Sequence, residues 1–213
     1  MATLSMIYGN VGRNRVVLTA LGICSNLGLG KDPLSAVFGG DNLSLLEKFR
    51  LSVNEKEVLI ARVSDRLVSE VIGDRRLELA AKYPQFISRN VELAEICISQ
   101  ISNQIDLLLG KFDRSRIAVV VATSTSGIAE GCEAVSNKLA NGSLSSNYQY
   151  SQQEIGALSC YIRERLQLKG LSYTISTACS SSAKVFKSAR SLIQNDLADA
   201  VILGGIDSLS PLT

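Results

Sequence analysis

The chain has 213 residues, of which 46% are hydrophobic and 20% are charged, and its formal net charge is +2. This composition suits one folded domain or two small ones with a sizeable core, and it argues against a disordered chain. Charges of both signs are interspersed and no basic arm occurs, which argues against nucleic acid as a ligand. The longest strongly apolar run, at residues 117–122, is too short to cross a bilayer, and residues 1–15 lack the pattern of a signal peptide. We therefore expect a cytoplasmic protein.

The first predicted strand covers residues 16–23 and leads into a glycine-rich turn at 25–30. The turn ends in Gly30-Lys31, as a phosphate-binding loop does. However, Ser25 stands where that loop has its first glycine, and Asp32 stands where it has a magnesium-binding Ser or Thr. We interpret the segment as an ordinary strand-to-helix loop. Residues 32–90 predict a short helix at 33–38 and a strand at 57–63, with loops and short helix elsewhere.

A long amphipathic helix is predicted next, with Asn90 as its N-cap, Glu92 in its first turn and Gly110 at its end. Its apolar positions repeat at intervals of three and four residues: Val91, Ala94, Ile98, Ile101, Ile105 and Leu108. Residues 117–122 (IAVVVA) then form a continuous apolar run, which is typical of a strand buried on both faces.

Two further helices are predicted before the most informative stretch. The first is ended by Asn141-Gly142 and has one apolar face: Ile128, Cys132, Val135 and Leu139. The second starts at a capping box, Ser151-x-x-Glu154, ends at Gly170 and has another such face: Ile155, Leu158, Ile162 and Leu166. A strand at 172–176, a helix and a strand at 200–204 follow. Because strands and helices alternate, we predict an α/β fold with a largely parallel sheet.

The five cysteines, at positions 24, 97, 132, 160 and 179, form no Cys-x-x-Cys pair, and the chain has no histidine. Metal-ligand spacing is therefore absent, no metal is expected, and an odd number of cysteines suits reduced thiols. We interpret Cys24, Cys97, Cys132 and Cys160 as small core residues.

Cys179 differs because it lies between a strand and a helix, in the stretch TISTACSSSAKVFKSARSLIQ at 174–194. The first N–H groups of a helix have no internal partners and carry partial positive charge, which favours a thiolate and can stabilise an oxyanion. A sharp strand-to-helix turn also exposes its side chain, as in a nucleophile elbow. Position alone leaves open that Cys179 is another core residue. A serine nucleophile is disfavoured because Gly-x-Ser-x-Gly is absent.

The segment TACSSS at 177–182, with DAVILGG at 199–205 downstream, resembles the active-site segment of β-ketoacyl synthases. These condensing enzymes of fatty-acid and polyketide assembly have the thiolase fold. The resemblance covers residues 15–213 and is weakest between 40 and 88. It implies a layered α/β fold with one mixed, largely parallel five-stranded sheet flanked by helices. It also implies that Cys179 is the nucleophile and contributes an oxyanion-hole N–H, and that its acyl group undergoes decarboxylative Claisen condensation with malonyl-acyl-carrier-protein.

In that family a second, similar half supplies two histidines, a lysine and a glycine-rich loop. We therefore expect residues 1–213 to be the N-terminal, nucleophile-bearing half, with the C-terminal half absent, and we expect no condensation by this half alone. The alternative is a non-catalytic partner subunit like a chain length factor, although such relatives usually lack the cysteine. A hydrolase or plain acyltransferase lacks a visible base.

The resemblance also implies further site residues and partners. Thr125 matches the position that lines the floor of the acyl pocket, where a small residue leaves room for a longer chain; the alternative is an ordinary loop. Arg89 lies near the cations that contact acyl carrier protein; the alternative is a solvated surface arginine. No cofactor is expected, because phosphopantetheine arrives on the carrier. A homodimer paired through the strand at 172–176, or a second chain, should cover an apolar face.

Overall fold

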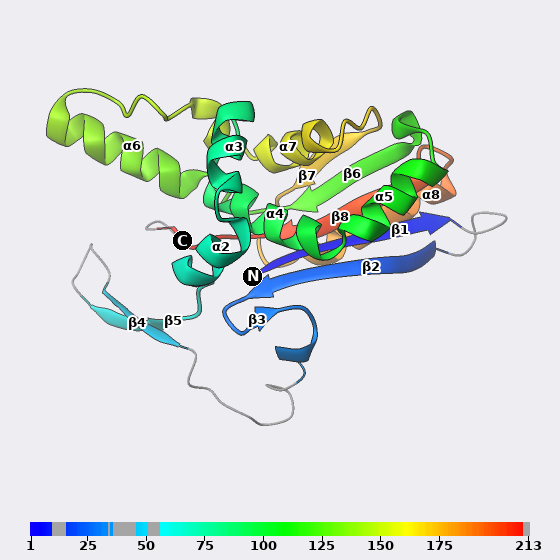
Figure 1. Cartoon of the computed structure of the whole chain (residues 1–213), viewed down its shortest axis with the longest axis horizontal. Coiled ribbons are helices and arrows are strands. Elements are labelled where there is room, and N and C mark those ends of the chain that lie inside the picture. Colours follow the sequence, from blue (N-terminus) through cyan, green and yellow to red (C-terminus); the bar gives the residue numbers. More distant parts are fainter. Residues whose placement is uncertain (10–15, 34, 36–45, 51–55, 211–213) are drawn as a thin grey trace.

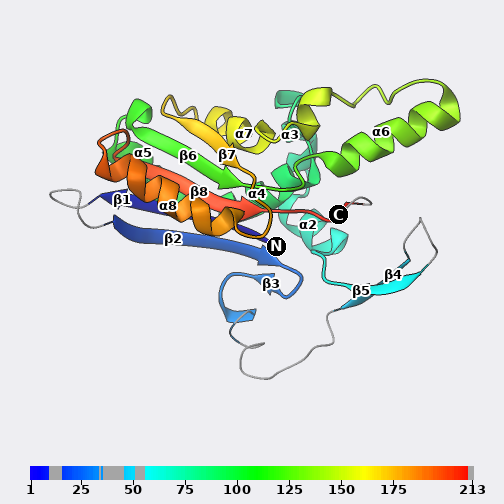
Figure 2. The ribbon, with the colours of Figure 1, turned by 180° about the vertical axis from the view of Figure 1, so that it is seen from behind.

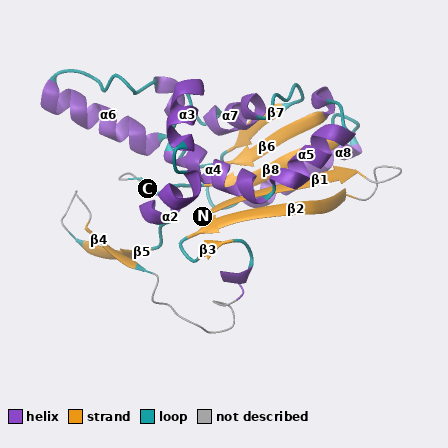
Figure 3. Cartoon of the chain, viewed as in Figure 1, coloured by secondary structure: helices purple, strands orange, loops and turns teal. Residues whose placement is uncertain are grey.

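The computed structural model describes residues 1–9, 16–33, 35, 46–50 and 56–210. A six-stranded sheet runs through these residues, with helices on both faces (Figure 1). A separate antiparallel pair of strands, β4 (Glu47–Arg50) and β5 (Glu57–Ile60), lies apart from that sheet (Figure 3). Among the described helices, none combines the length and apolar character needed to cross a bilayer.

The main sheet has the strand order β3-β2-β1-β8-β6-β7. Its strands are listed here in chain order: β1 (Ala2–Gly9), β2 (Val16–Ser25), β3 (Gly28–Leu29), β6 (Ile117–Ala122), β7 (Ser172–Ile175) and β8 (Ala200–Ile206). β6 pairs in parallel with β7 and β8, whereas β1 pairs antiparallel with β2 and β8, and β2 with β3. The sheet is mixed, as expected, but it has six strands instead of five, and antiparallel pairs outnumber parallel ones.

The unpredicted strands β1 and β3 belong to this sheet, whereas the strand predicted at 57–63 pairs with β4 outside it. β1 lies between β2 and β8, and its polar residue Ser5 is buried along with its apolar neighbours Leu4 and Met6. Both faces of a central strand are covered, so its polar residues are buried as well. The mixed polar and apolar residues then show no pattern from which a strand could be predicted. β3 has only two residues, which is too few for any periodicity to appear.

Helices cover the sheet in two layers. On one face α4 (Arg89–Gln100), α5 (Ser102–Lys111) and α7 (Ala157–Arg165) pack against a core that includes Val119 and Val121. On the other face α8 (Ser181–Gln194) packs against a core that includes Val120 and Leu203 (Figure 2). Alternate residues of β6 thus serve opposite cores, and all six are buried, which confirms the strand predicted at 117–122.

The long helix predicted up to Gly110 is two helices, α4 and α5, separated at Ile101 (φ −118°). The predicted N-cap is also wrong: Ser88 caps α4 by accepting the Val91 N–H at 3.4 Å, and Asn90 is a buried residue of the first turn. Glu92 lies in that turn as expected. Gly110 is internal to α5, which ends at Lys111.

Helix α6 (Ile128–Asn141) ends as predicted, with Gly142 in the left-handed conformation (φ 78°). Its apolar face is not covered by the described residues, since Val135 and Leu139 are 57% and 84% exposed. The capping box predicted at Ser151 and Glu154 is wrong, because residues 150–153 form the 3-10 helix η2 (Tyr150–Gln153) and the Ser151 hydroxyl donates to the Gln85 carbonyl.

Other predicted bounds shift by a few residues. α7 ends at Arg165, not at Gly170, and β5 ends at Ile60, short of residue 63. The short helix expected at 33–38 falls mostly outside the described residues, of which Pro33 and Ser35 are helical. Three elements connect these parts: α2 (Asp65–Ile72), α3 (Arg75–Lys82) and the 3-10 helix η1 (Arg114–Arg116).

Candidate active site

Three parallel strands end at one edge of the sheet, and their connections form the candidate site. Ala122 of β6 lies opposite both Ile175 of β7 and Gly205 of β8. The carboxyl ends of these strands therefore bring together three segments: the turn at 123–126, which we call the β6 turn; the elbow at 176–180; and Asp207. Ligands of open α/β sheets bind at such an edge.

The elbow joins β7 to α8 and presents Cys179 to solvent. Ala178 has a left-handed conformation (φ 52°), which costs a residue with a Cβ about 1–2 kcal/mol. The Ser181 hydroxyl donates to the Ala178 carbonyl and accepts the Thr177 N–H, both at 2.7 Å. The Ser180 hydroxyl donates to the Thr177 carbonyl at 2.9 Å. The serines that follow the cysteine thus stabilise the sharp turn.

Exposure separates Cys179 from the other cysteines. Cys24 and Cys97 are fully buried, as predicted, and burial raises the pKa of both thiols, that of Cys97 to about 12. Cys132 and Cys160 are partly buried. The exposed position of Cys179 at the start of a helix contradicts the interpretation of this residue as core.

The β6 turn is held by Asp207, a residue to which the sequence assigned no role. Asp207 Oδ1 accepts the Ser124 N–H at 2.7 Å and the Thr125 N–H at 3.2 Å. The same oxygen accepts the hydroxyls of Thr123, at 3.1 Å, and Thr125, at 3.2 Å. An isolated aspartate after an apolar strand gives no sequence signal for such a contact.

Asn90 joins the same polar cluster from the first turn of α4. Its Nδ2 donates to Thr123 Oγ1 at 2.9 Å and to the Ile206 carbonyl at 3.3 Å. Asn90 is 1% exposed and Thr125 is 6% exposed, so the cluster is buried beneath the β6 turn. Thr125 lies in the β6 turn, after the end of β6, and it does not line any of the three cavities described among residues 1–9, 16–33 and 56–210.

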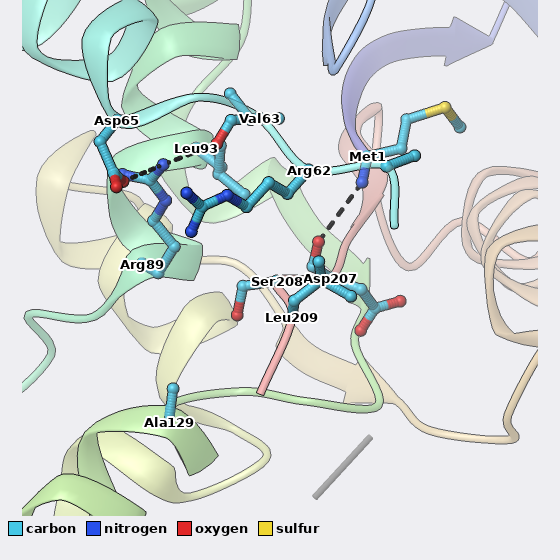
Figure 4. A pocket seen from close by; sticks show the side chains of 11 residues that line it. Met1, Arg62, Val63, Asp65, Arg89, Leu93, Ala129, Asp207, Ser208 and Leu209 are labelled. Atoms are coloured by element: carbon cyan, nitrogen blue, oxygen red, sulfur yellow. Dashed lines mark hydrogen bonds and ion pairs between the residues drawn. The ribbon is translucent and has the colours of Figure 1, made fainter. Parts of the chain in front are cut away.

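Arg89 is not the solvated surface arginine considered as an alternative, because its side chain is only 21% exposed. Its guanidinium pairs with Asp65 at 2.9 Å and Glu92 at 3.0 Å. It also donates to the Val63 carbonyl at 2.9 Å. It lines a cavity of about 240 Å³ together with Arg62 and Ser208 (Figure 4). Arg89, the residue predicted to contact a carrier protein, is therefore already paired with two carboxylates of its own chain.

Burial also changes the pKa of a carboxylate next to Arg89, that of Glu130. Glu130, in the first turn of α6, accepts a hydrogen bond from the backbone N–H of Arg89 through Oε1, at 2.7 Å. Desolvation raises the pKa of its carboxyl above 4.5, and the nearby charges of Glu92 and Glu133 add to that effect. No group of three or more His, Cys, Asp or Glu side chains with metal-binding geometry occurs in the part of the chain that the structure describes.

Comparisons with known proteins agree on one family. A model of the N-terminal domain of β-ketoacyl synthases matches residues 92–213. The 3-oxoacyl-[acyl-carrier-protein] synthase 1 of Haemophilus influenzae is 25% identical over 207 residues, which are 92% of this chain and 47% of that protein.

Two solved structures extend the likeness. A structure of a ketosynthase in complex with its chain length factor, from Xenorhabdus doucetiae, superposes with a TM-score of 0.74 at 30% identity, covering 98% of this chain and 48% of that one. The ishigamide ketosynthase/chain length factor shares the fold, with a TM-score of 0.69 at 16% identity, over 97% of this chain and 48% of that one. The chain spans about half the length of these relatives.

Proposed function

The chain belongs to the β-ketoacyl synthase family, and from this membership we propose that it is the acyl-accepting, N-terminal half of a ketosynthase. Its layered α/β fold is thiolase-like, as in ketosynthases of known structure. The observation that carries the proposal is the exposed Cys179 at the junction of β7 and α8, beside the β6 turn and Asp207. The nucleophile of such a family is expected at this place.

The proposed first step is acyl transfer to Cys179. The thiolate sulfur attacks the carbonyl carbon of an acyl thioester on the phosphopantetheine arm of acyl carrier protein, and the carbonyl oxygen becomes an oxyanion. N–H groups at the start of α8, including that of Cys179, can donate to this oxyanion. The bond from carbon to the carrier sulfur then breaks, and the carrier thiol leaves with the proton that Cys179 gave up. This chain needs no cofactor of its own for that step.

The proposed second step requires residues that this half does not contain. Malonyl-acyl-carrier-protein loses carbon dioxide, and the resulting carbanion attacks the acyl carbonyl on Cys179. The cysteine sulfur then leaves, and a β-ketoacyl group remains on the carrier. In the family, histidines of the C-terminal half stabilise the carbanion, and this chain has no histidine. We therefore propose that residues 1–213 accept the acyl group and that another chain or half completes the condensation.

Two partners follow from this proposal: acyl carrier protein and a second polypeptide. The second is supported by the two similar structures, in each of which a ketosynthase occurs with a chain length factor. Thr125 is proposed to contact the acyl chain. Arg89 is the proposed contact for the acidic carrier, although its pairing with Asp65 and Glu92 leaves it less available than an unpaired arginine.

A non-catalytic role as a chain-length-factor-like subunit is the second candidate, favoured by the chain length factors in those same two structures. Such a subunit would shape a pocket or stabilise a dimer without carrying an acyl group. The retained Cys179 argues for the catalytic lineage, and acylation of that thiol separates the two candidates.

The experiment is intact-mass analysis of the chain after incubation with octanoyl-coenzyme A. The wild type and Cys160→Ala, which removes a half-buried thiol, should each gain one octanoyl group, and Cys179→Ala should gain none. Labelling that persists in Cys179→Ala, or an unlabelled wild type, would contradict the proposal and favour the non-catalytic role.

A further inference from the structure

We propose that Asp207 is a positioning residue of this acyl-transfer site. By accepting a hydrogen bond from the Thr125 hydroxyl, it leaves the methyl group of that threonine as the contact for the acyl chain. The inference rests on the proposed function, since it concerns which acyl groups Cys179 accepts. It addresses a specific difficulty, which is that a free hydroxyl is an unfavourable neighbour for a hydrocarbon chain.

Among the described residues, the hydrogen bonds of the Asp207 carboxylate all involve a single short segment. Both backbone N–H groups of Ser124 and Thr125, and the hydroxyls of Thr123 and Thr125, lie within 3.2 Å of its Oδ1. Hydrogen bonds to an ionised carboxylate are roughly twice as strong as neutral ones. The carboxylate therefore fixes the backbone of the β6 turn and the orientation of Thr125 together.

The hydroxyl of Thr125 is hydrogen-bonded within the buried cluster. Besides its bond to Asp207, it accepts the Ser208 N–H at 3.2 Å and lies 3.4 Å from Asn90 Nδ2. A threonine hydroxyl has one donor and two acceptor positions; Asp207 takes the donor and the Ser208 N–H takes one acceptor position. The methyl group is the part of the side chain that remains for contact with an acyl chain.

Asp207 directs its carboxylate to the turn and not to the nearby arginines. Figure 4 shows the carboxylate on the side of the backbone opposite the guanidinium groups of Arg62 and Arg89. Asp207 and its neighbour Ser208 both line the cavity beside those arginines.

The β6 turn also lies next to the elbow. β6 is the strand between β7 and β8, and Ala122 is paired with Ile175, so the turn and the elbow leave the sheet about 5 Å apart. The end of β8 contacts the elbow side as well, because a Cβ built at Gly205 would lie 2.2 Å from Ser182 Oγ in the first turn of α8. Asp207 is therefore placed to fix the distance between Thr125 and the acylated thiol.

The test compares rates of Cys179 acylation by octanoyl- and acetyl-coenzyme A, in the wild type, Asp207→Ala and Asp207→Asn. Asp199→Ala is the matched control, because Asp199 precedes β8 and bonds to Arg116 at the opposite end of that strand. Alkylation of Cys179 by iodoacetamide, which needs no acyl pocket, reports on the elbow itself.

Asp207→Ala should lower the octanoyl rate relative to the acetyl rate by about fivefold or more, the effect of one lost hydrogen bond, with iodoacetamide alkylation unchanged. Asp207→Asn keeps an oxygen acceptor, should show a smaller shift, and carries the test if Asp207→Ala does not fold. An unchanged rate ratio, or the same shift in Asp199→Ala, overturns the inference. A wild type that takes up no acyl group overturns the proposed function and the inference with it.

Discussion

Glu130 links two helices beside the candidate site. Its Oε1 accepts the N–H of Arg89 at the start of α4, while its Oε2 is buried with no hydrogen-bond partner among the described residues. A buried carboxylate oxygen without a partner disfavours the ionised form, which is consistent with the raised pKa of this group. Glu130 should therefore make the stability of the chain depend on pH.

The sign follows from linkage. Because the folded pKa of Glu130 is raised above the ordinary 4.5, its contribution to stability is fully present below that value and is lost as pH rises through the raised pKa. Glu130→Gln keeps an acceptor for the Arg89 N–H but cannot ionise. The free energy of unfolding of this variant minus that of the wild type, from urea titrations, should increase between about pH 4 and about pH 7.

The exposed Glu164→Gln is the matched control for removal of one surface charge. If the free energy of unfolding of Glu130→Gln minus that of the wild type stays constant or decreases as pH rises, this account of the carboxyl group is contradicted.

The sequence could predict individual site residues only where they belong to a local pattern. Cys179 was predictable because a β-branched run, small residues and helical spacing surround it. Asp207 was not, since its partners at 123–125 are more than 80 residues away in the chain and meet it only because β6 pairs with β8. Asn90 was assigned to a helix cap from its residue type, whereas its amide serves a buried cluster that no local pattern reveals.

At the scale of elements, the contact between the β6 turn and η2 leaves no room for a side chain. A Cβ built on Gly127, which directly follows the turn, would lie 2.2 Å from the carbonyl oxygen of Gln152. Both atoms involved belong to backbone segments that are fixed by their neighbours, so this approach requires glycine.

Gly127→Ala should therefore lower the free energy of unfolding by about 1–3 kcal/mol, the usual cost of overpacking, as measured by urea denaturation. Gly110→Ala is the matched control, because Gly110 lies within α5 and a Cβ there meets nothing within 4 Å. That control should be neutral or stabilise the helix by up to about 1 kcal/mol. Equal effects of the two substitutions would show that the Gly127 contact does not constrain the fold.

The helix predicted from residue 90 to residue 110 shows where periodicity fails for elements. Its apolar repeat continues without interruption across Ile101, yet the helix breaks there. At the end of α4, the Gln100 side chain bonds to both the N–H and the carbonyl of Ile23 in β2. A tertiary contact of this kind fixes the end of a helix without leaving a sequence signal.

At the scale of the whole molecule, β7 is an edge strand of the sheet. Val119 N–H donates to the Leu171 carbonyl, and Val119 is paired with Ser172. In a parallel ladder of this register, the backbone groups of Ser172 and Thr174 face away from β6. Unpaired edges favour pairing with another strand. The strand predicted to join two copies of the chain is thus free to do so among the described residues.

We expect the wild type to be a dimer in solution and Thr174→Pro to be a monomer, because proline removes an outward N–H without affecting a bond to β6. Thr174→Ala keeps that N–H and should remain a dimer. Size-exclusion chromatography with light scattering distinguishes these states. A monomeric wild type, or a dimeric Thr174→Pro, would show that β7 does not join two copies.

The sequence predicted the fold class through its alternating strands and helices, and the family through TACSSS. It could not predict the strand order, because the central position of β1 depends on pairing with β8, the last strand described.

Large apolar side chains such as Leu18 and Phe186, 50% and 47% exposed, agree with the expectation that another polypeptide covers part of this half.

The most direct test of the central claim compares the folded chain with the free peptide of residues 174–194, which contains the same cysteine without the fold. Both are incubated with octanoyl-coenzyme A, and the rate of acylation at Cys179 is followed by mass spectrometry. Our account predicts that the folded chain reacts at least about tenfold faster, because the elbow aligns N–H groups with the developing oxyanion. Equal rates would contradict it, since the fold would then expose Cys179 without activating it.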